Sequence, residues 1–126
     1  MSDTLQHRIA LEAEHAVTGI TSLPPDQAKE YRAFCEGFPA LLRTAGLLQS
    51  VTFLKAKAKH PHAALLANLT EQFHKLGLLR RDEEFLQRTL SLSTSDYITW
   101  TRIAYQVAYW HKRFAQALII RAKEGG

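Results

Sequence analysis

Apolar residues recur at helical spacing on both sides of a glycine in the stretch that spans residues 38–57. Before and after Gly46, the apolar positions fall three or four residues apart, which is the period of an amphipathic α-helix and differs from the alternation of a β-strand. The stretch therefore predicts the end of one helix, a tight glycine turn and the start of a second helix. Its apolar positions are Phe38, Leu41, Leu42, Ala45, Leu47, Leu48, Val51 and Leu54.

The same helical period continues through the rest of the chain, and no segment alternates in the manner of a strand. Pro39 lies inside one helical pattern without interrupting it, so we expect a kink there rather than a break. Gly77 is expected to end a helix in the left-handed conformation. We predict an all-α, single-domain helical bundle of about five to six helices with a long C-terminal helix. The predicted helices span residues 4–21, 26–45, 47–59, 65–76, 82–90 and 96–122.

The length of 126 residues predicts one domain, residues 1–126, with a hydrophobic core of its own. Cys35 is the single cysteine and falls on the apolar side of its helix, so we expect a buried thiol in a reducing compartment rather than a nucleophile. No apolar run reaches the ~18 residues that cross a bilayer, and the N-terminus lacks the pattern of a signal peptide. We expect a cytoplasmic protein that does not bind membranes.

Two Glu-x-x-His pairs, Glu12/His15 and Glu71/His74, have the spacing found in di-metal sites of helical bundles. Such ligands must point inward, whereas the helical period places Glu71 opposite the apolar face and His15 well off it. His111 falls within an apolar stripe and is expected to be a hydrogen-bonded core histidine. The sequence shows no nucleophile with a base and no glycine-rich phosphate loop. We expect no enzyme activity, no metal, no cofactor and no small-molecule substrate.

Positive charge is concentrated in the second part of the chain. Up to Ala45 there are four Lys or Arg and six Asp or Glu, whereas from Gly46 onward there are twelve and six. This asymmetry favours a partner that carries phosphates. Basic side chains that face solvent at the C-terminal end of a helix, where they complement the helix dipole, produce the same pattern. The basic residues Lys55, Lys57 and Lys59 end the third predicted helix.

The last predicted helix has an outer face that combines basic, aromatic and aliphatic side chains, opposite a core stripe that includes Trp100, Val107, Phe114 and Leu118. Either another helix covers this outer face, which is the commoner case, or the face docks a neighbouring subunit or stacks bases beside phosphates. The pattern alone leaves these alternatives open. The outer face consists of Ile98, Arg102, Tyr105, Tyr109, Lys112, Arg113 and Ile120.

The helices on either side of Gly46 also invite a helix-turn-helix interpretation, with Gln49, Ser50 and Lys55 reaching DNA bases. The fit is poor, because the motif needs a small residue where the two helices crowd each other and this chain has Leu42 there. We keep a helix-turn-helix DNA-binding regulator as an alternative. A helical protein-interaction module without nucleic-acid binding is a further alternative.

Residues 31–57 and 110–118 resemble the small subunit of type III-B CRISPR effector complexes, the Cmr complexes, in the order and separation of their motifs. The second segment contains a Trp-His-Lys-Arg-Phe-Ala block. The resemblance covers nearly the whole domain. In the first segment it rests on Tyr31, Pro39, Ala40, Leu41, Arg43, Gly46, Leu47, Gln49, Phe53, Leu54 and Lys57.

The resemblance implies a non-catalytic structural subunit of an RNA-guided, RNA-targeting antiviral complex. Members of this family are helical bundles that stack head to tail along the guide RNA and its target. The implied partners are the other subunits of the complex, further copies of the same chain, and the guide and target RNA. The resemblance also implies RNA contacts by Arg43, Lys57, Lys112 and Arg113.

To these RNA contacts we add Lys55 and Lys59 on the charge argument alone. We expect all six side chains to bind phosphates without reading the RNA sequence. The exposed apolar and aromatic positions of the last helix are assigned to an interface with other protein subunits, which consists of Ile98, Tyr105, Tyr109 and Ile120.

Overall fold

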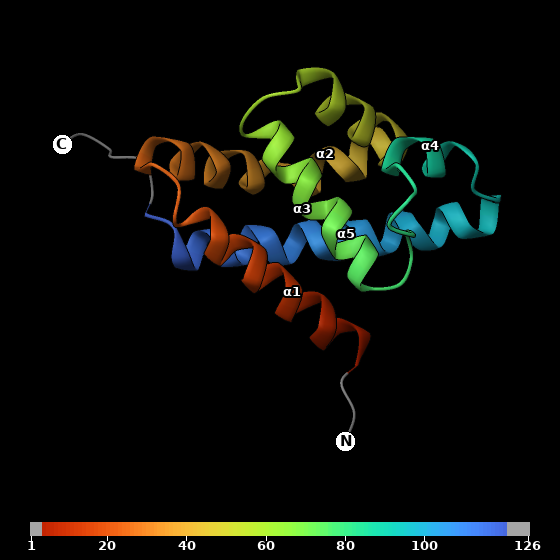
Figure 1. The fold of residues 1–126 in the computed structure, drawn as a ribbon, viewed down its shortest axis with the longest axis horizontal. Helices are drawn as coiled ribbons and strands as arrows, with labels where there is room; N and C mark the ends of the chain where they lie inside the picture. The colour runs from red at the N-terminus through yellow and green to blue at the C-terminus, as the bar shows by residue number, and fades with distance from the viewer. Residues whose placement is uncertain (1–3, 121–126) are drawn as a thin grey trace.

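In a computed structural model, residues 4–120 are described and form a bundle of five helices (Figure 1). Residues 4–120 contain no strand, so the predicted all-α class with a long C-terminal helix is confirmed. The helices are α1 (Leu5–Ile20), α2 (Pro25–Lys57), α3 (His62–Lys75), α4 (Phe85–Leu90) and α5 (Thr94–Leu118).

The long helices α2 and α5 run antiparallel and form the frame of the bundle (Figure 1). Near the start of α2, Arg32 donates hydrogen bonds to the carbonyl oxygens of Gln116 and Ile119 at the end of α5, at 3.3 and 2.7 Å. Near the start of α5, Tyr97 contacts Leu48 in the second part of α2. Helix α1 packs on α5 and α3 packs on α2, so the remaining side of α5 stays outside the bundle.

Gly46 divides α2 into two helical segments. Its φ of 84° and ψ of 168° are non-helical and lie in a region that is almost restricted to glycine. The hydroxyl of Tyr97 accepts a hydrogen bond from the N–H of Leu48 at 3.0 Å. It replaces the backbone carbonyl that would accept from this N–H if the helix were unbroken at Gly46. The predicted boundary at Gly46 is therefore confirmed. The first segment continues through Pro39, as the sequence predicted.

Local signals in the sequence determine several other helix ends. Gly77 has a φ of 78° and ends α3, where the N–H of Leu78 donates to the carbonyl of Phe73 at 2.9 Å. This is the expected left-handed helix end. At the starts of α4 and α5, the side chains of Glu84 and Ser93 accept hydrogen bonds from backbone N–H groups of the first turn. The predicted starts were residues 82 and 96, whereas α4 begins at Phe85 and α5 begins at Thr94.

Two predicted helix ends are too late. Helix α2 ends at Lys57 instead of residue 59, because Ala58 adopts the left-handed conformation with a φ of 55°. Helix α5 ends at Leu118, whereas the prediction extended it to residue 122, which lies outside the described residues. Ile119 has extended backbone angles, its side chain is buried, and Arg32 binds its carbonyl oxygen. Leu118, predicted for the core, is 43 % exposed because Ile119 is buried in its place.

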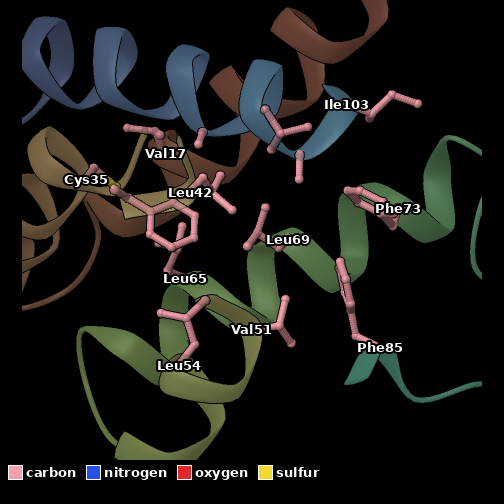
Figure 2. Packing of buried hydrophobic residues seen from close by; sticks show 14 of the residues in the cluster. Val17, Cys35, Leu42, Val51, Leu54, Leu65, Leu69, Phe73, Phe85 and Ile103 are labelled. Atoms are coloured by element: carbon pink, nitrogen blue, oxygen red, sulfur yellow. The ribbon is translucent and has the colours of Figure 1, made fainter. Parts of the chain in front are cut away.

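The hydrophobic core lies among α1, α3 and the two long helices (Figure 2). Leu65 and Leu69 of α3 lie at its centre, and Phe73 lies close to Phe85 of α4. The ring centroids of Phe73 and Phe85 are 4.8 Å apart, and that of Trp100 in α5 is 5.0 Å from Phe73. Burial of these apolar groups holds α3, α4 and α5 together. It also fixes which side of α5 faces outward.

Candidate nucleic-acid interface

Two long segments of the chain contain no Asp or Glu. Residues 37–70 cover most of α2 and the start of α3, and residues 97–118 cover almost all of α5. The helices α2 and α5 pack side by side, and neither segment contributes an acidic residue that would neutralise its cationic side chains. The cationic residues of these segments are Arg43, Lys55, Lys57, Lys59, Arg102, Lys112 and Arg113.

Two arginine–tyrosine pairs lie one helical turn apart on the outer side of α5. The Nη2 atom of Arg43 in α2 donates to the hydroxyl of Tyr105 at 3.2 Å, and the guanidinium carbon lies 5.3 Å from the ring centroid. Arg113 donates to the hydroxyl of Tyr109 through Nε and Nη2 at 3.1 and 2.9 Å, with its guanidinium carbon 5.0 Å from the ring. These cation–π contacts hold both guanidinium groups on tyrosine rings. We refer to the four residues as the arginine–tyrosine surface.

The arginine–tyrosine surface joins residues that the sequence assigned to different partners. Arg43 and Arg113 were predicted to bind RNA, whereas Tyr105 and Tyr109 were predicted to bind protein. Each arginine contacts a tyrosine directly, so a partner that covers one member of a pair also meets the other. Next to Arg113 in the chain, Lys112 is half-buried, and its side chain makes no hydrogen bond or ion pair with another described residue.

The two remaining predicted interface residues lie near opposite ends of α5. Ile98 is in the first turns of the helix and is 52 % exposed, whereas Ile120 lies beyond the helix and is 80 % exposed. Ile120 therefore does not share a helix face with Ile98, because α5 ends at Leu118. No described helix covers Ile98 or Tyr109, which excludes a covering helix at these two residues within the part of the chain that the structure describes.

The lysine cluster consists of Lys55, Lys57 and Lys59 at the end of α2, and its members differ in their contacts. Lys55 Nζ lies 3.0 Å from the Oε2 atom of Glu84. Burial acts to raise the pKa of Glu84, but hydrogen bonds from backbone N–H groups and from Lys55 outweigh it and lower the pKa. Lys57 Nζ lies 5.5 Å from the ring centroid of Phe53, and the side chain of Lys59 has no hydrogen bond or ion pair with another described residue. Lys57 and Lys59 are therefore freer than Lys55 to bind an anion.

An aromatic group that the sequence analysis missed lies beside the lysine cluster. The ring centroid of His62 is 4.4 Å from that of Phe34 and 5.2 Å from that of Phe53, and Phe53 is 38 % exposed. Burial lowers the pKa of His62, and the nearby charges of Lys57 and His60 lower it further. The group forms because the start of α3 folds back onto α2, so the spacing of these residues along the chain carried no signal for it.

His111 is buried and hydrogen-bonded, as predicted. Its Nδ1 atom lies 3.0 Å from the hydroxyl of Tyr31, and its Nε2 atom contacts Oε1 of Gln72. Asn68 donates to the same tyrosine hydroxyl at 2.9 Å. Burial lowers the pKa of His111 to about 4, so the ring is neutral near pH 7 and this network joins α2, α3 and α5. Burial also raises the pKa of the Cys35 thiol to about 12, which fits the predicted buried thiol.

Glu12 and Glu71, the two carboxylates considered as metal ligands, are partners in ion pairs. Glu12, His15 and Glu71 line one hollow between α1 and α3. However, Glu12 lies 3.2 Å from Lys75 Nζ, and Glu71 lies 2.6 Å from Arg81 Nη1, whose hydrogen bond lowers the pKa of Glu71. Residues 4–120 contain no group of three or more His, Cys, Asp or Glu side chains placed to hold a metal ion. Within the same range, no helix combines the length and apolar character needed to cross a membrane.

Comparison with known proteins confirms the resemblance seen in the sequence. The family described as CRISPR-associated protein (Cas_Cmr5) matches residues 5–118. The CRISPR system Cmr subunit Cmr5 of Thermus thermophilus is 36 % identical over 95 residues, which cover 71 % of this chain and 75 % of that protein. The crystal structure of a CRISPR-associated Cmr5 family protein from the same organism has a TM-score of 0.81 and 31 % identity, covering 94 % of this chain and 100 % of that chain. This chain therefore belongs to the Cmr5 family, the small subunits of type III-B CRISPR Cmr complexes.

Proposed function

We propose that this chain is a non-catalytic structural subunit of a Cmr effector complex, in which it lies along the guide RNA and its RNA target and contacts the RNA backbone. One observation supports this beyond family membership. Residues 37–70 and 97–118, which include most of the packed helices α2 and α5, carry seven cationic side chains and no acidic residue. Such a surface attracts a polyanion, and its phosphate contacts release counterions on binding.

The cationic residues divide by the phosphate contacts that they can make. Arg43 and Arg113 present planar guanidinium groups held on tyrosine rings, which suit two-point contacts to phosphate oxygens. Lys57, Lys59 and Lys112 act as point charges. Lys55 contributes fully only when its ion pair with Glu84 opens. These contacts position RNA without reading its sequence, and pairing between guide and target supplies the sequence choice.

Further copies of the chain and other subunits would meet the two ends of α5. A head-to-tail stack joins two different surfaces of the same chain, so it needs a complementary patch at each end. Leu90 and Ile98 are 57 % and 52 % exposed near the start of α5. At its other end, Leu118 and Ile120 line an apolar hollow of about 310 Å³ together with residues of the α1–α2 turn. These two patches lie ~30 Å apart along the helix.

The helix-turn-helix alternative has less support. Ser50, which would reach a DNA base in that motif, is fully buried. The break in α2 is the single residue Gly46, whereas the motif joins its helices by a turn of about three to four residues. A protein-interaction module remains the main competing hypothesis, because exposed Ile98 and Tyr109 would also suit a protein surface.

Binding of the full chain to labelled single-stranded RNA, and to duplex DNA of equal length, tests this proposal in a series of salt concentrations. We expect weak RNA binding that weakens steeply with salt and does not depend on RNA sequence. Absence of RNA binding even at low salt would favour the protein-interaction module. Preference for one duplex DNA sequence would favour the helix-turn-helix regulator.

A further inference from the structure

A hollow of about 300 Å³ lies where the start of α1 meets the outer side of α5, next to the arginine–tyrosine surface. It is lined by three aromatic rings and two amide side chains. Two of the rings, those of Tyr105 and Tyr109, also carry the guanidinium groups of the surface. The lining residues are Gln6, Tyr105, Gln106, Tyr109 and Trp110.

Contacts with neighbouring side chains fix the indole ring of Trp110 in this hollow. The ring stacks on Phe114 at a centroid distance of 5.6 Å and meets Tyr109 edge to face at 6.2 Å. Its Nε1 atom donates a hydrogen bond to Oε1 of Gln6 at 2.8 Å, which connects α5 to the start of α1. The aromatic walls are therefore formed before any ligand binds.

Two amide groups of the hollow are available for hydrogen bonds. The amide oxygen of Gln6 accepts from Trp110, which leaves its amide nitrogen to donate. The Gln106 side chain makes no hydrogen bond with another described residue. An amide offers a donor and an acceptor side by side. The exposed edge of an unpaired nucleobase offers complementary groups, and aromatic side chains stack on its faces.

The charge at the hollow fits a nucleotide. Arg43 and Arg113 lie on Tyr105 and Tyr109 at its rim, and residues 97–118 contain no acidic residue. We propose that this hollow binds one unpaired base of single-stranded RNA, while Arg43 and Arg113 bind the adjoining phosphates. This inference rests on the proposed function. It extends that function from backbone contacts to a base contact, because stacking needs no particular base.

An apolar side chain of a neighbouring subunit would fill the aromatic walls, but it would leave the two amides and the two guanidinium groups without partners. Burying such polar groups unpaired is unfavourable. The composition of the hollow therefore favours a nucleotide, which supplies partners for the rings, the amides and the cations together.

The test compares two single-stranded RNA oligomers of equal length and charge, one complete and one without bases. The Trp100→Phe variant of the full chain leaves Trp110 as the only tryptophan. We expect the complete oligomer to quench Trp110 fluorescence and to bind about tenfold more tightly than the abasic oligomer. The Gln106→Leu variant should lose affinity for the complete oligomer only. Gln87→Leu, on the exposed side of α4, is the matched control and should lose none.

Two results would overturn the inference in different ways. Equal affinity for both oligomers, with no quenching of Trp110 and no effect of Gln106→Leu, would exclude a base in the hollow and leave the backbone proposal intact. If the full chain bound neither oligomer at low salt, this would exclude the backbone proposal and the base site together.

Discussion

The hydroxyl group of Tyr97 accepts a hydrogen bond from the N–H of Leu48 at 3.0 Å, and this bond joins the start of α5 to the break in α2. The same hydroxyl lies 3.7 Å from the position that a side-chain carbon at Gly46 would occupy. The second segment of α2 carries the lysine cluster. One tyrosine of α5 therefore helps to orient a predicted RNA-binding group on another helix.

Replacing Tyr97 by Phe leaves the N–H of Leu48 without its partner. Both residues are partly buried, so we expect the free energy of unfolding to fall by about 1–2 kcal/mol. Urea unfolding followed by circular dichroism measures this change. Tyr105→Phe is the matched control, because its hydroxyl meets the exposed Arg43 and should contribute less. Equal midpoints for Tyr97→Phe and the wild type would show that the bond does not stabilise the break.

Alanine at position 46 should destabilise the protein, whereas alanine at Gly37 should not. The backbone angles of Gly46 are strained for a residue with a side chain, at a cost on the order of 1–3 kcal/mol. Gly37 lies in the helical part of α2 and a side-chain carbon there meets nothing within 4 Å. Gly37→Ala should therefore stabilise the helix by roughly 0.5–1 kcal/mol. Thermal unfolding of both variants checks the opposite signs, and a shift in the same direction would contradict the assigned break.

His111 should make the protein less stable in acid. Burial lowers its pKa from 6.5 to about 4, so the unfolded chain takes up a proton at a higher pH than the folded chain. The stability from neutral His111 is fully present above pH 6.5 and is lost as the pH falls toward 4, by about 3 kcal/mol.

The His111→Gln variant removes this dependence while keeping groups that can bond to Tyr31 and Gln72. Urea unfolding between pH 7 and pH 4 should show a smaller loss of stability for His111→Gln than for the wild type. His15→Gln removes an exposed histidine and should follow the wild type. Parallel curves for the wild type and His111→Gln would rule out a neutral buried histidine.

Releasing Lys55 from Glu84 should strengthen RNA binding. Serine at position 84 can still cap α4, so Glu84→Ser should fold normally while freeing Lys55 and removing one acidic charge. We expect higher RNA affinity, and we expect the plot of log affinity against log salt concentration to become steeper by about 0.7. Asp82→Ser removes a nearby acidic charge that pairs with Arg80, and it should have a smaller effect. If both variants changed RNA binding equally, Lys55 would have no specific part in it.

The helices could be predicted from the sequence because their end signals are local. Gly46 and Gly77 have positive φ, and Ser93 caps α5, at the places where the apolar period changes. The end of α5 could not be predicted in this way. Ile119 leaves the helix because Arg32, far away in the sequence, binds its carbonyl oxygen and because its side chain enters the core.

The candidate site could be predicted only as a set of charges and faces. The helical spacing of residues placed Tyr105 and Arg113 on the outer side of α5. It could not show that the guanidinium group of Arg43 lies over the ring of Tyr105. Lys55 resembled its lysine neighbours in the sequence, and its ion pair with Glu84 appears only once α4 packs against α2. Contacts between distant segments depend on tertiary packing, which the helical period alone does not specify.

The central claim of the proposed function is that cationic side chains of α2 and α5 bind RNA phosphates. The most direct measurement is the slope of log affinity against log salt for single-stranded RNA, with the Lys112→Ala/Arg113→Ala double variant. The control is Arg80→Ala/Arg88→Ala, which removes the same charge from ion pairs with acidic residues near α4. We predict a slope shallower by about 1.4 for the first variant and an unchanged slope for the control. Equal slopes for the wild type and both variants would contradict phosphate binding by Lys112 and Arg113.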